Sequence, residues 1–351
     1  MQSKPKQSKP KTQSSFNLRD FLFSYGFLLV LLVVVIYFSA AAPYFFSLTT
    51  LISILHTAAP MLVLASGIAF VIMTAKLDIS VGSTAFLASS VGAILITRAH
   101  VPFSIAVLAI LGVGFLAGAI NGFTVVVLRV NPLIATLGTM MALRGLALQL
   151  TNSMVISLPQ NLRALGGMRV AGVYVDILFA FAVLVIMQIV HTRTTFGRQV
   201  MAIGNSPEIA ERLGVKVKWI DFWAYVLCGV MAALGSVLLM LQLGAVSPDA
   251  GSGYEFSAIA MAVIGGVSLF GGEGTIIPGI ILGGFTLTVI QAGLNYIGAS
   301  VYVYPFVRGG IIFIAMFADA LKVKVKVRVK MISENEPTLP MVPPGDASTT
   351  A

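Results

Sequence analysis

The sequence is poor in charged residues and in cysteine. Only 10% of its 351 residues are Asp, Glu, Lys or Arg, against about 25% in a typical soluble domain, whereas 58% are hydrophobic. Its single cysteine, Cys228, excludes an intramolecular disulfide and any cysteine-rich metal site. A membrane-spanning helix needs about 20 apolar residues. The composition therefore predicts a polytopic membrane protein and excludes a large soluble domain.

Motifs of catalysis are missing as well. No Gly-x-x-x-x-Gly-Lys-Ser/Thr phosphate loop occurs, so the chain is not expected to bind ATP in that way. His56, His100 and His191 stand far apart on different segments. The string around Ser268 nearly matches a nucleophile elbow but lacks its last glycine. We expect no catalytic residue, no metal site and no cofactor of the chain's own.

Ten apolar segments follow one another along the chain, at 21–42, 51–75, 79–97, 101–128, 132–150, 170–190, 219–243, 256–272, 275–297 and 301–319. If both termini lie in the cytoplasm, seventeen Lys and Arg residues fall on the inner side, three fall outside and two lie within segments. This bias is the one that the positive-inside rule predicts. It explains the net charge of +9 without a nucleic-acid partner.

The predicted fold class is an all-α polytopic membrane protein with about ten transmembrane helices and both termini in the cytoplasm. Its domains are a disordered basic tail over 1–20, a transmembrane domain over 21–320 that includes the inner loop 191–218, and a second tail over 321–351. The start of the second tail, LKVKVKVRVK, is expected to anchor on anionic lipid.

Two charges, Lys76 and Asp78, interrupt the otherwise uncharged run from Leu51 to Thr97. A charge at the centre of a bilayer costs at least about 2.5 kcal/mol. The charge distribution places this pair at the inner turn between the second and third segments. Either Asp78 caps the third helix while Lys76 snorkels to the lipid surface, or Asp78 and Ser80 line the inner end of a transport path.

Three further charged residues are candidates for function. Arg144 and Arg308 lie within apolar segments, so each needs a polar neighbour or an aqueous cavity, and each either holds the structure together or lines a pathway. Glu255 is predicted at the outer end of the eighth segment. It either helps to dock a partner protein or is a solvated loop acid.

Glycines indicate where helices pack closely and where they break. Gly114, Gly118 and Gly122 share one helix face, as do Gly279 and Gly283, which is typical of close helix packing. A second group, between the eighth and ninth segments, predicts an irregular break in the backbone; it comprises Gly265, Gly266, Gly271, Gly272 and Gly274.

The largest inner loop, 191–218, is predicted to contain a short soluble helix. Residues that favour helix starts, helix ends and the helix dipole occur there in the expected order: Ser206, Pro207, Glu208, Arg212 and Gly214. Ile209, Ala210 and Leu213 give it a weakly apolar face. This helix either enters a groove of a soluble subunit or lies flat in the membrane interface.

Several strings together resemble the permease subunits of bacterial ribose-type sugar importers driven by ATP. They are LDISVGS at 77–83, LIATLGTMMALRG at 133–145, TTFGRQVMAIG at 194–204 and GSGYEFSAIAMAVIGGVSLFGGEGT at 251–275. The resemblance runs from about Phe45 to Asp319. It departs from the family at Lys76, where glycine is usual, and at Ser257, where many members have Asp, and these departures leave the sugar unspecified.

The resemblance implies a multi-pass permease of the bacterial inner membrane that works as a homodimer or heterodimer. It implies a cytoplasmic ATPase, which binds the ATP, and a periplasmic sugar-binding protein. It also implies inverted repeats of helices two to five and seven to ten, as in cobalamin-type importers. ATPase coupling is expected at Gly204, Ser206, Glu208, Ala210, Glu211 and Leu213.

Two alternatives remain open from the sequence. An ion-coupled secondary transporter would need intramembrane acids, and Asp78 is the one that looks partly suitable. A permease for branched-chain amino acids is a related possibility that the LDISVGS string disfavours.

Overall fold

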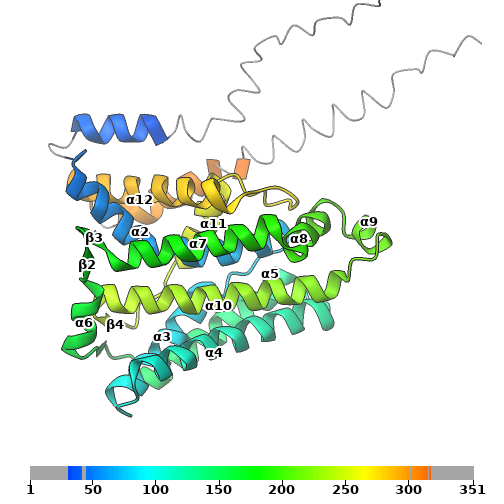
Figure 1. Ribbon diagram of the computed structural model, residues 1–351, viewed down its shortest axis with the longest axis horizontal. Coiled ribbons are helices and arrows are strands. Elements are labelled where there is room, and N and C mark those ends of the chain that lie inside the picture. The colour runs from blue at the N-terminus through cyan, green and yellow to red at the C-terminus, as the bar shows by residue number, and fades with distance from the viewer. Residues whose placement is uncertain (1–30, 42–44, 301, 315, 318–351) are drawn as a thin grey trace, which may run out of the picture.

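The structure, a computed structural model, describes residues 31–41, 45–300, 302–314 and 316–317, which are mostly helical (Figure 1). The predicted tails, 1–20 and 321–351, lie outside the described residues. After an apolar helix over Leu31–Ala41, the elements run in chain order as α2 Leu48–Met73, α3 Val81–Thr97, α4 Phe103–Gly122, η1 Phe123–Val127, α5 Pro132–Thr151, α6 Gln160–Gly166, α7 Val175–Arg193, α8 Thr195–Asn205, α9 Pro207–Arg212, α10 Val217–Leu243, α11 Tyr254–Ile264, η2 Ile276–Ile280 and α12 Ile281–Tyr296, and a last apolar helix covers Val303–Ile314.

The strands are two residues long. β1 (Ile156–Ser157) pairs antiparallel with β4 (Ala245–Val246), and β2 (Arg169–Val170) forms a hairpin with β3 (Val173–Tyr174). The hairpin and α6 lie at the left in Figure 1, and α8 and α9 lie at the right. We call these the α6 end and the α9 end.

Six helices in the described part of the chain are long and apolar enough to cross a membrane: α2, α4 with η1, α5, α7, α10 and η2 with α12. Four shorter apolar helices are Leu31–Ala41, α3, α11 and Val303–Ile314. The predicted segment 256–272 is wrong at its end, because α11 stops at Ile264. Four glycines in the turn that follows adopt positive φ angles, and the predicted break there is confirmed.

Helix starts follow local capping rules. The Ser47 side chain accepts a hydrogen bond from Thr50 N at the start of α2. Asn131 does the same for Leu133 N at the start of α5, where Pro132 fills the first helical position. These capped starts set the direction in which each long helix leaves its loop.

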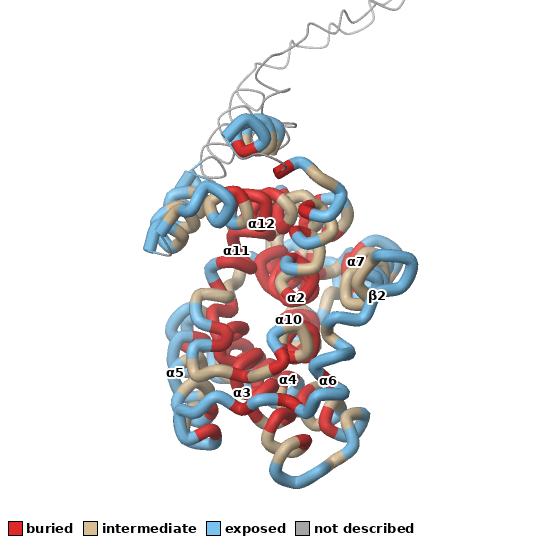
Figure 2. The backbone as a smooth tube through the Cα atoms, turned by 90° about the vertical axis from the view of Figure 1, so that its left-hand side faces the viewer, coloured by how far each residue is buried: buried red, intermediate tan, exposed pale blue. Residues whose placement is uncertain are grey.

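Helices α2 and α10 lie next to each other at the centre of the molecule (Figure 2). They run antiparallel, because Gly67 of α2 contacts Met231 of α10 while Pro60 O, earlier in α2, contacts Gly235, later in α10. In their most apolar stretches 78% and 72% of residues are buried, against 17% in α5. Helices that are apolar on all sides must lie inside a protein or against lipid. Helices α2 and α10 lie inside the protein, whereas α5 keeps an apolar surface exposed.

The predicted glycine packing is confirmed. A Cβ added at Gly114 would collide with the carbonyl oxygen of Gly229 in α10, and one at Gly118 with that of Tyr225. Gly283 of α12 is equally tight against Met261 of α11. These small residues let backbones approach so closely that a methyl group would force the helices apart.

The predicted loop helix is confirmed as α9, with the Ser206 side chain accepting from Ile209 N at 3.3 Å and Gly214 at φ +85°. Two details differ from the prediction. The loop 191–218 also holds α8, a helix that the capping signals of α9 did not reveal. Ala210 is buried, so the exposed apolar residues of α9 are Ile209 and Leu213 alone.

Candidate functional site

Asp78 lies inside the protein in a hydrogen-bonded cluster between α2 and α3. Its Oδ1 accepts from Ser80 N at 2.9 Å and from Ser80 Oγ at 2.7 Å. Asn121 of α4 donates to both carboxylate oxygens, at 3.2 and 3.3 Å, and to Ser80 Oγ at 2.7 Å. Asp78 and Ser80 are each 1% exposed. The cluster fastens the start of α3 to α4 and lines no open passage in this conformation.

The backbone beside Asp78 is also held by side chains from two other helices. Tyr225 of α10 donates its hydroxyl to Leu77 O at 3.2 Å, and Ile79 N donates to Thr136 Oγ1 of α5 at 3.3 Å. The turn therefore connects five helices: α2, α3, α4, α5 and α10. Ser80 directly precedes α3 and makes no capping hydrogen bond with its own side chain, whereas Asp78, two residues earlier, accepts from Ser80 N at the start of the helix.

Lys76 does not snorkel to the lipid surface. Its Nζ lies 2.9 Å from Asp221 Oδ2 of α10 and donates to Thr74 O at 3.3 Å. The Asp221 side chain is 6% exposed, and its Oδ1 has no hydrogen-bond partner. A buried carboxylate needs a counter-charge. Lys76, one of the two positions at which the chain departs from the pattern it resembles, is therefore the partner of a buried acid.

Arg144 and Arg308 meet around one loop that enters the protein between β4 and α11. Arg144 of α5 donates to Pro248 O at 3.3 Å and to Ala250 O at 3.5 Å, and its guanidinium lies 5.3 Å from the centre of the Phe86 ring. Arg308 donates to Gly253 O at 3.1 Å. The two arginines, distant in sequence, thus hold the same loop from two helices.

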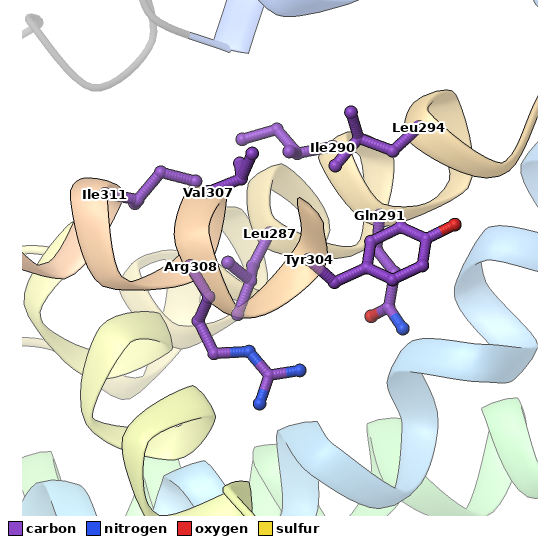
Figure 3. A pocket seen from close by; sticks show the side chains of 8 residues that line it. All are labelled: Leu287, Ile290, Gln291, Leu294, Tyr304, Val307, Arg308 and Ile311. Atoms are coloured by element: carbon purple, nitrogen blue, oxygen red, sulfur yellow. The ribbon is translucent and has the colours of Figure 1, made fainter. Parts of the chain in front are cut away.

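Figure 3 shows Arg308 directed away from the apolar Val307 and Ile311 of its own helix. The cleft beside it, between α12 and the last helix, has a volume of about 20 Å³. That is room for little more than one water molecule. A sugar does not fit into this cleft.

Glu255 is 7% exposed, which differs from the outer, solvated position expected of it. It lies in the first turn of α11, against the first turn of α3: a Cβ added at Gly82 would collide with Glu255 Oε2 and with Gly251 O. Two short helices therefore begin at the same place inside the protein. Discontinuous helices that meet in this way are where transporters place their binding sites.

The turn after α11 contacts the loop at the α9 end. Gly272 N donates to Met73 O at 2.9 Å, and Asn205 at the end of α8 donates to Gly272 O at 3.4 Å. A Cβ added at Gly204 would collide with Met73 O and Gly272 N. We call Met73, Gly204, Asn205 and Gly272 the latch, because they join α8 to the ends of α2 and α11.

Some polar residues of these sites were missed at the level of sequence. Asp221 and Asp176 lie in apolar segments, which is itself a signal, and both proved to be paired with cationic or titratable groups. Asp176 Oδ2 lies 2.8 Å from His56 Nδ1, and Gln242 donates to the Asp176 carboxylate and to the backbone oxygen of His56. Asn121 gave no signal, because an asparagine beside glycines has no distinctive pattern.

The long apolar helices, the broken helices and the paired internal charges define a polytopic transport protein. Residues 50–316 match the family described as "Branched-chain amino acid transport system / permease component". The chain belongs to this family. It is the permease subunit of an importer and not an enzyme, as the sequence predicts.

Curated relatives agree with this assignment. The chain is 33% identical over 300 residues to a galactose/methyl galactoside import permease protein of Escherichia coli, covering 79% of this chain and 88% of the relative. It is 32% identical over 317 residues to a D-allose transport system permease protein of Escherichia coli, covering 90% of this chain and 97% of the relative. It is 33% identical over 283 residues to a ribose import permease protein of the same organism, covering 79% of this chain and 88% of the relative. No solved structure matches the chain.

Proposed function

We propose that this permease carries a monosaccharide across the bacterial inner membrane, with ATP bound and hydrolysed by a separate cytoplasmic subunit. In this proposal ten helices cross the membrane, both termini are cytoplasmic and the α9 end faces the cytoplasm. The excess of Lys and Arg on that side supports the orientation. The sugar class is supported by the galactose, allose and ribose named for the relatives.

The latch at the α9 end carries the proposal. Leu213 is 77% exposed and Ile209 58%, so α9 offers two apolar side chains to a partner. The base of the same loop touches the backbone of α2 and of the turn after α11 through Gly204. A movement of α9 driven by the ATPase would therefore be passed to the two helices that end there. Ser206, Glu208 and Glu211 shape this loop.

The passage is proposed to lie where Arg144 and Arg308 hold the loop before α11. Guanidinium groups donate several hydrogen bonds in fixed directions, which suits the hydroxyl groups of a sugar. Gly138 and Gly145 of α5 and Gly309 of the last helix have open space where a Cβ would stand. A second permease subunit, identical or not, would pack on these faces and close the passage.

A periplasmic binding protein would deliver the sugar at the α6 end. Glu255 is too deeply buried to touch a docked protein directly. We expect the exposed loops around β2 and β3 to make that contact instead.

Uptake by the assembled importer tests the proposal. The permease is produced with its ATPase and binding protein in cells lacking their own sugar importers, and the entry of labelled pentoses, hexoses and branched-chain amino acids is measured. ATP-dependent uptake of one sugar is expected. Uptake of leucine or valine would favour the amino-acid alternative, and uptake driven by an ion gradient without the ATPase would favour the secondary transporter.

A single substitution tests the role of α9. Leu213→Asp places a charge on the exposed apolar face and is expected to abolish both ATPase association and uptake. Leu165→Asp is a matched control, because Leu165 is 40% exposed in α6 at the opposite end. The control should keep ATPase association. Normal association of the Leu213→Asp variant would contradict the proposed contact.

A further inference from the structure

An open groove of about 640 Å³ lies at the α9 end, between η1 and the first turns of α10. Its apolar wall includes Val126, Val127 and Phe222, and Trp219 stands beside two lysines, Lys216 and Lys218. Glu211 also reaches it from α9. The groove thus has a polar rim and an apolar wall.

The rim is basic and available. Lys216 and Lys218 are both exposed, and neither is in an ion pair with a described residue. Two cations against one carboxylate leave a net positive charge. The rim therefore favours an anionic group over a neutral one.

Aromatic side chains of α10 lie next to the two lysines of the rim. Trp219 is 58% exposed, its ring centroid lies 5.5 Å from that of Trp223, and Phe222 lies 5.7 Å from Trp223, both pairs edge to face. Tryptophan beside lysine is typical of the boundary between membrane and water. This end of the groove has the chemistry of a headgroup region.

An apolar strip leaves the groove along α4 and η1. Its members are spaced by three or four residues, share one face and are at least half exposed: Leu116, Ile120, Phe123 and Val127. The ring centroid of Phe115, the residue before Leu116, lies 6.4 Å from that of Trp223. The strip therefore runs beside the aromatic rings of α10. The strip continues from the basic rim toward the membrane interior.

We propose that this groove binds an anionic phospholipid, with its phosphate between Lys216 and Lys218 and an acyl chain along the α4 strip. A basic rim joined to an exposed apolar strip is complementary to an amphiphile with a negatively charged headgroup. A soluble protein bound at the rim would leave the apolar strip uncovered. That the lipid belongs to the inner leaflet rests on the orientation proposed above, whereas the binding itself does not.

Tryptophan fluorescence gives a direct test, because Trp219 and Trp223 are the two tryptophans of the whole chain. The full-length permease is placed in phosphatidylcholine nanodiscs, and brominated phosphatidylglycerol or brominated phosphatidylcholine is added. Half-maximal quenching by brominated phosphatidylglycerol is expected at a lipid fraction about 30-fold lower than with brominated phosphatidylcholine. Each lysine contributes about 1 kcal/mol to the binding of an anionic lipid, and the sum of about 2 kcal/mol corresponds to this factor because about 1.4 kcal/mol is tenfold.

Three double variants make the test specific. Lys216→Gln with Lys218→Gln should quench alike with both lipids, whereas Lys216→Arg with Lys218→Arg should keep the preference. The control, Arg193→Gln with Arg198→Gln, removes two other exposed charges at the same end and should also keep it. Equal quenching of the unchanged protein by both lipids, or an unaltered preference in the glutamine variant, would overturn the proposal.

ATPase association is measured on the same variants. A glutamine variant that loses the ATPase while keeping its lipid preference would assign the groove to protein docking instead. Because the nanodisc measurement needs neither ATP nor sugar, its failure leaves the importer function standing, and a failed uptake assay leaves the lipid site standing.

Discussion

The two polar regions inside this protein differ in how tightly the protein holds them. Around Asp78 and Lys76, the carboxylates are buried and are met by short contacts of 2.7–2.9 Å from Ser80 and Lys76. Around Arg144 and Arg308, three guanidinium contacts of 3.1–3.5 Å reach backbone carbonyls, two from Arg144 and one from Arg308, and both arginines stay partly exposed. The first region fixes helices in place, whereas the second keeps donors to spare.

The position of a charged residue within an apolar segment therefore does not by itself predict that the residue takes part in transport. A buried carboxylate that is met by a cation or by several donors stabilises the fold, and a partly exposed guanidinium with donors left over can bind a solute. Substitutions in the first region should reduce stability, and those in the second should reduce uptake of the transported solute.

The largest loss of stability is expected from Lys76→Ala. The variant leaves Asp221 buried without its counter-charge, which costs about 3–5 kcal/mol. Thermal unfolding in detergent should show a much lower midpoint. The double variant Lys76→Met with Asp221→Leu should recover most of it, and an unchanged midpoint in the single variant would disprove the pairing.

Asp78→Ala should come next, at about 2–3 kcal/mol, because it removes the acceptor of the buried Ser80 donors and leaves Asn121 with Ser80 Oγ alone. Asp78→Asn keeps one acceptor oxygen and should cost less. Denaturation of both variants in the same detergent gives the order. Equal losses would mean that the stabilisation comes from the charged carboxylate and not from the shape and the acceptor oxygen that asparagine keeps.

Arg144→Ala and Arg308→Ala should change stability by less than about 1 kcal/mol, since long contacts to backbone carbonyls are weak. Their uptake should fall at least tenfold, equivalent to about 1.4 kcal/mol in the barrier. Arg144→Lys should recover part of it. A large drop in unfolding temperature with normal uptake by the remaining folded protein would place these arginines in the structural class.

The smallest effect is expected from Arg169→Gln in the β2–β3 hairpin. Its guanidinium lies 4.1 Å from the centre of the Tyr174 ring at an exposed site, where such a contact is worth about 0.5–1 kcal/mol. Unfolding and sugar uptake should both stay close to those of the unchanged protein. A loss of uptake alone would show that Arg169 itself takes part in the contact proposed between this hairpin and the binding protein.

Capping and helix periodicity could be read from the sequence because they are local. Ser206, Pro207 and Gly214 marked α9 correctly, and the glycine spacing in α4 marked a packed face. The break after α11 was visible in its glycines, although the helix end was placed eight residues too late. The orientation of Ala210 was missed, since a helix of six residues has no clear apolar stripe.

The charge partners required the tertiary structure. Lys76 and Asp221 are far apart along the chain and meet because α2 and α10 run antiparallel. Glu255 was expected at a surface and is buried because the loop before α11 enters the protein. The positions of Arg144 and Arg308 in apolar segments predicted that each has a polar partner. Nothing in the sequence predicted that both partners lie in the loop before α11.

By itself, the sequence determined the class of protein, the apolar segments and the capped loop helix α9, because composition, periodicity and capping act over a few residues. The tertiary structure decided which charges are structural and which have donors to spare. That distinction depends on what each side chain meets across helices, and helix contacts are set by packing between distant segments.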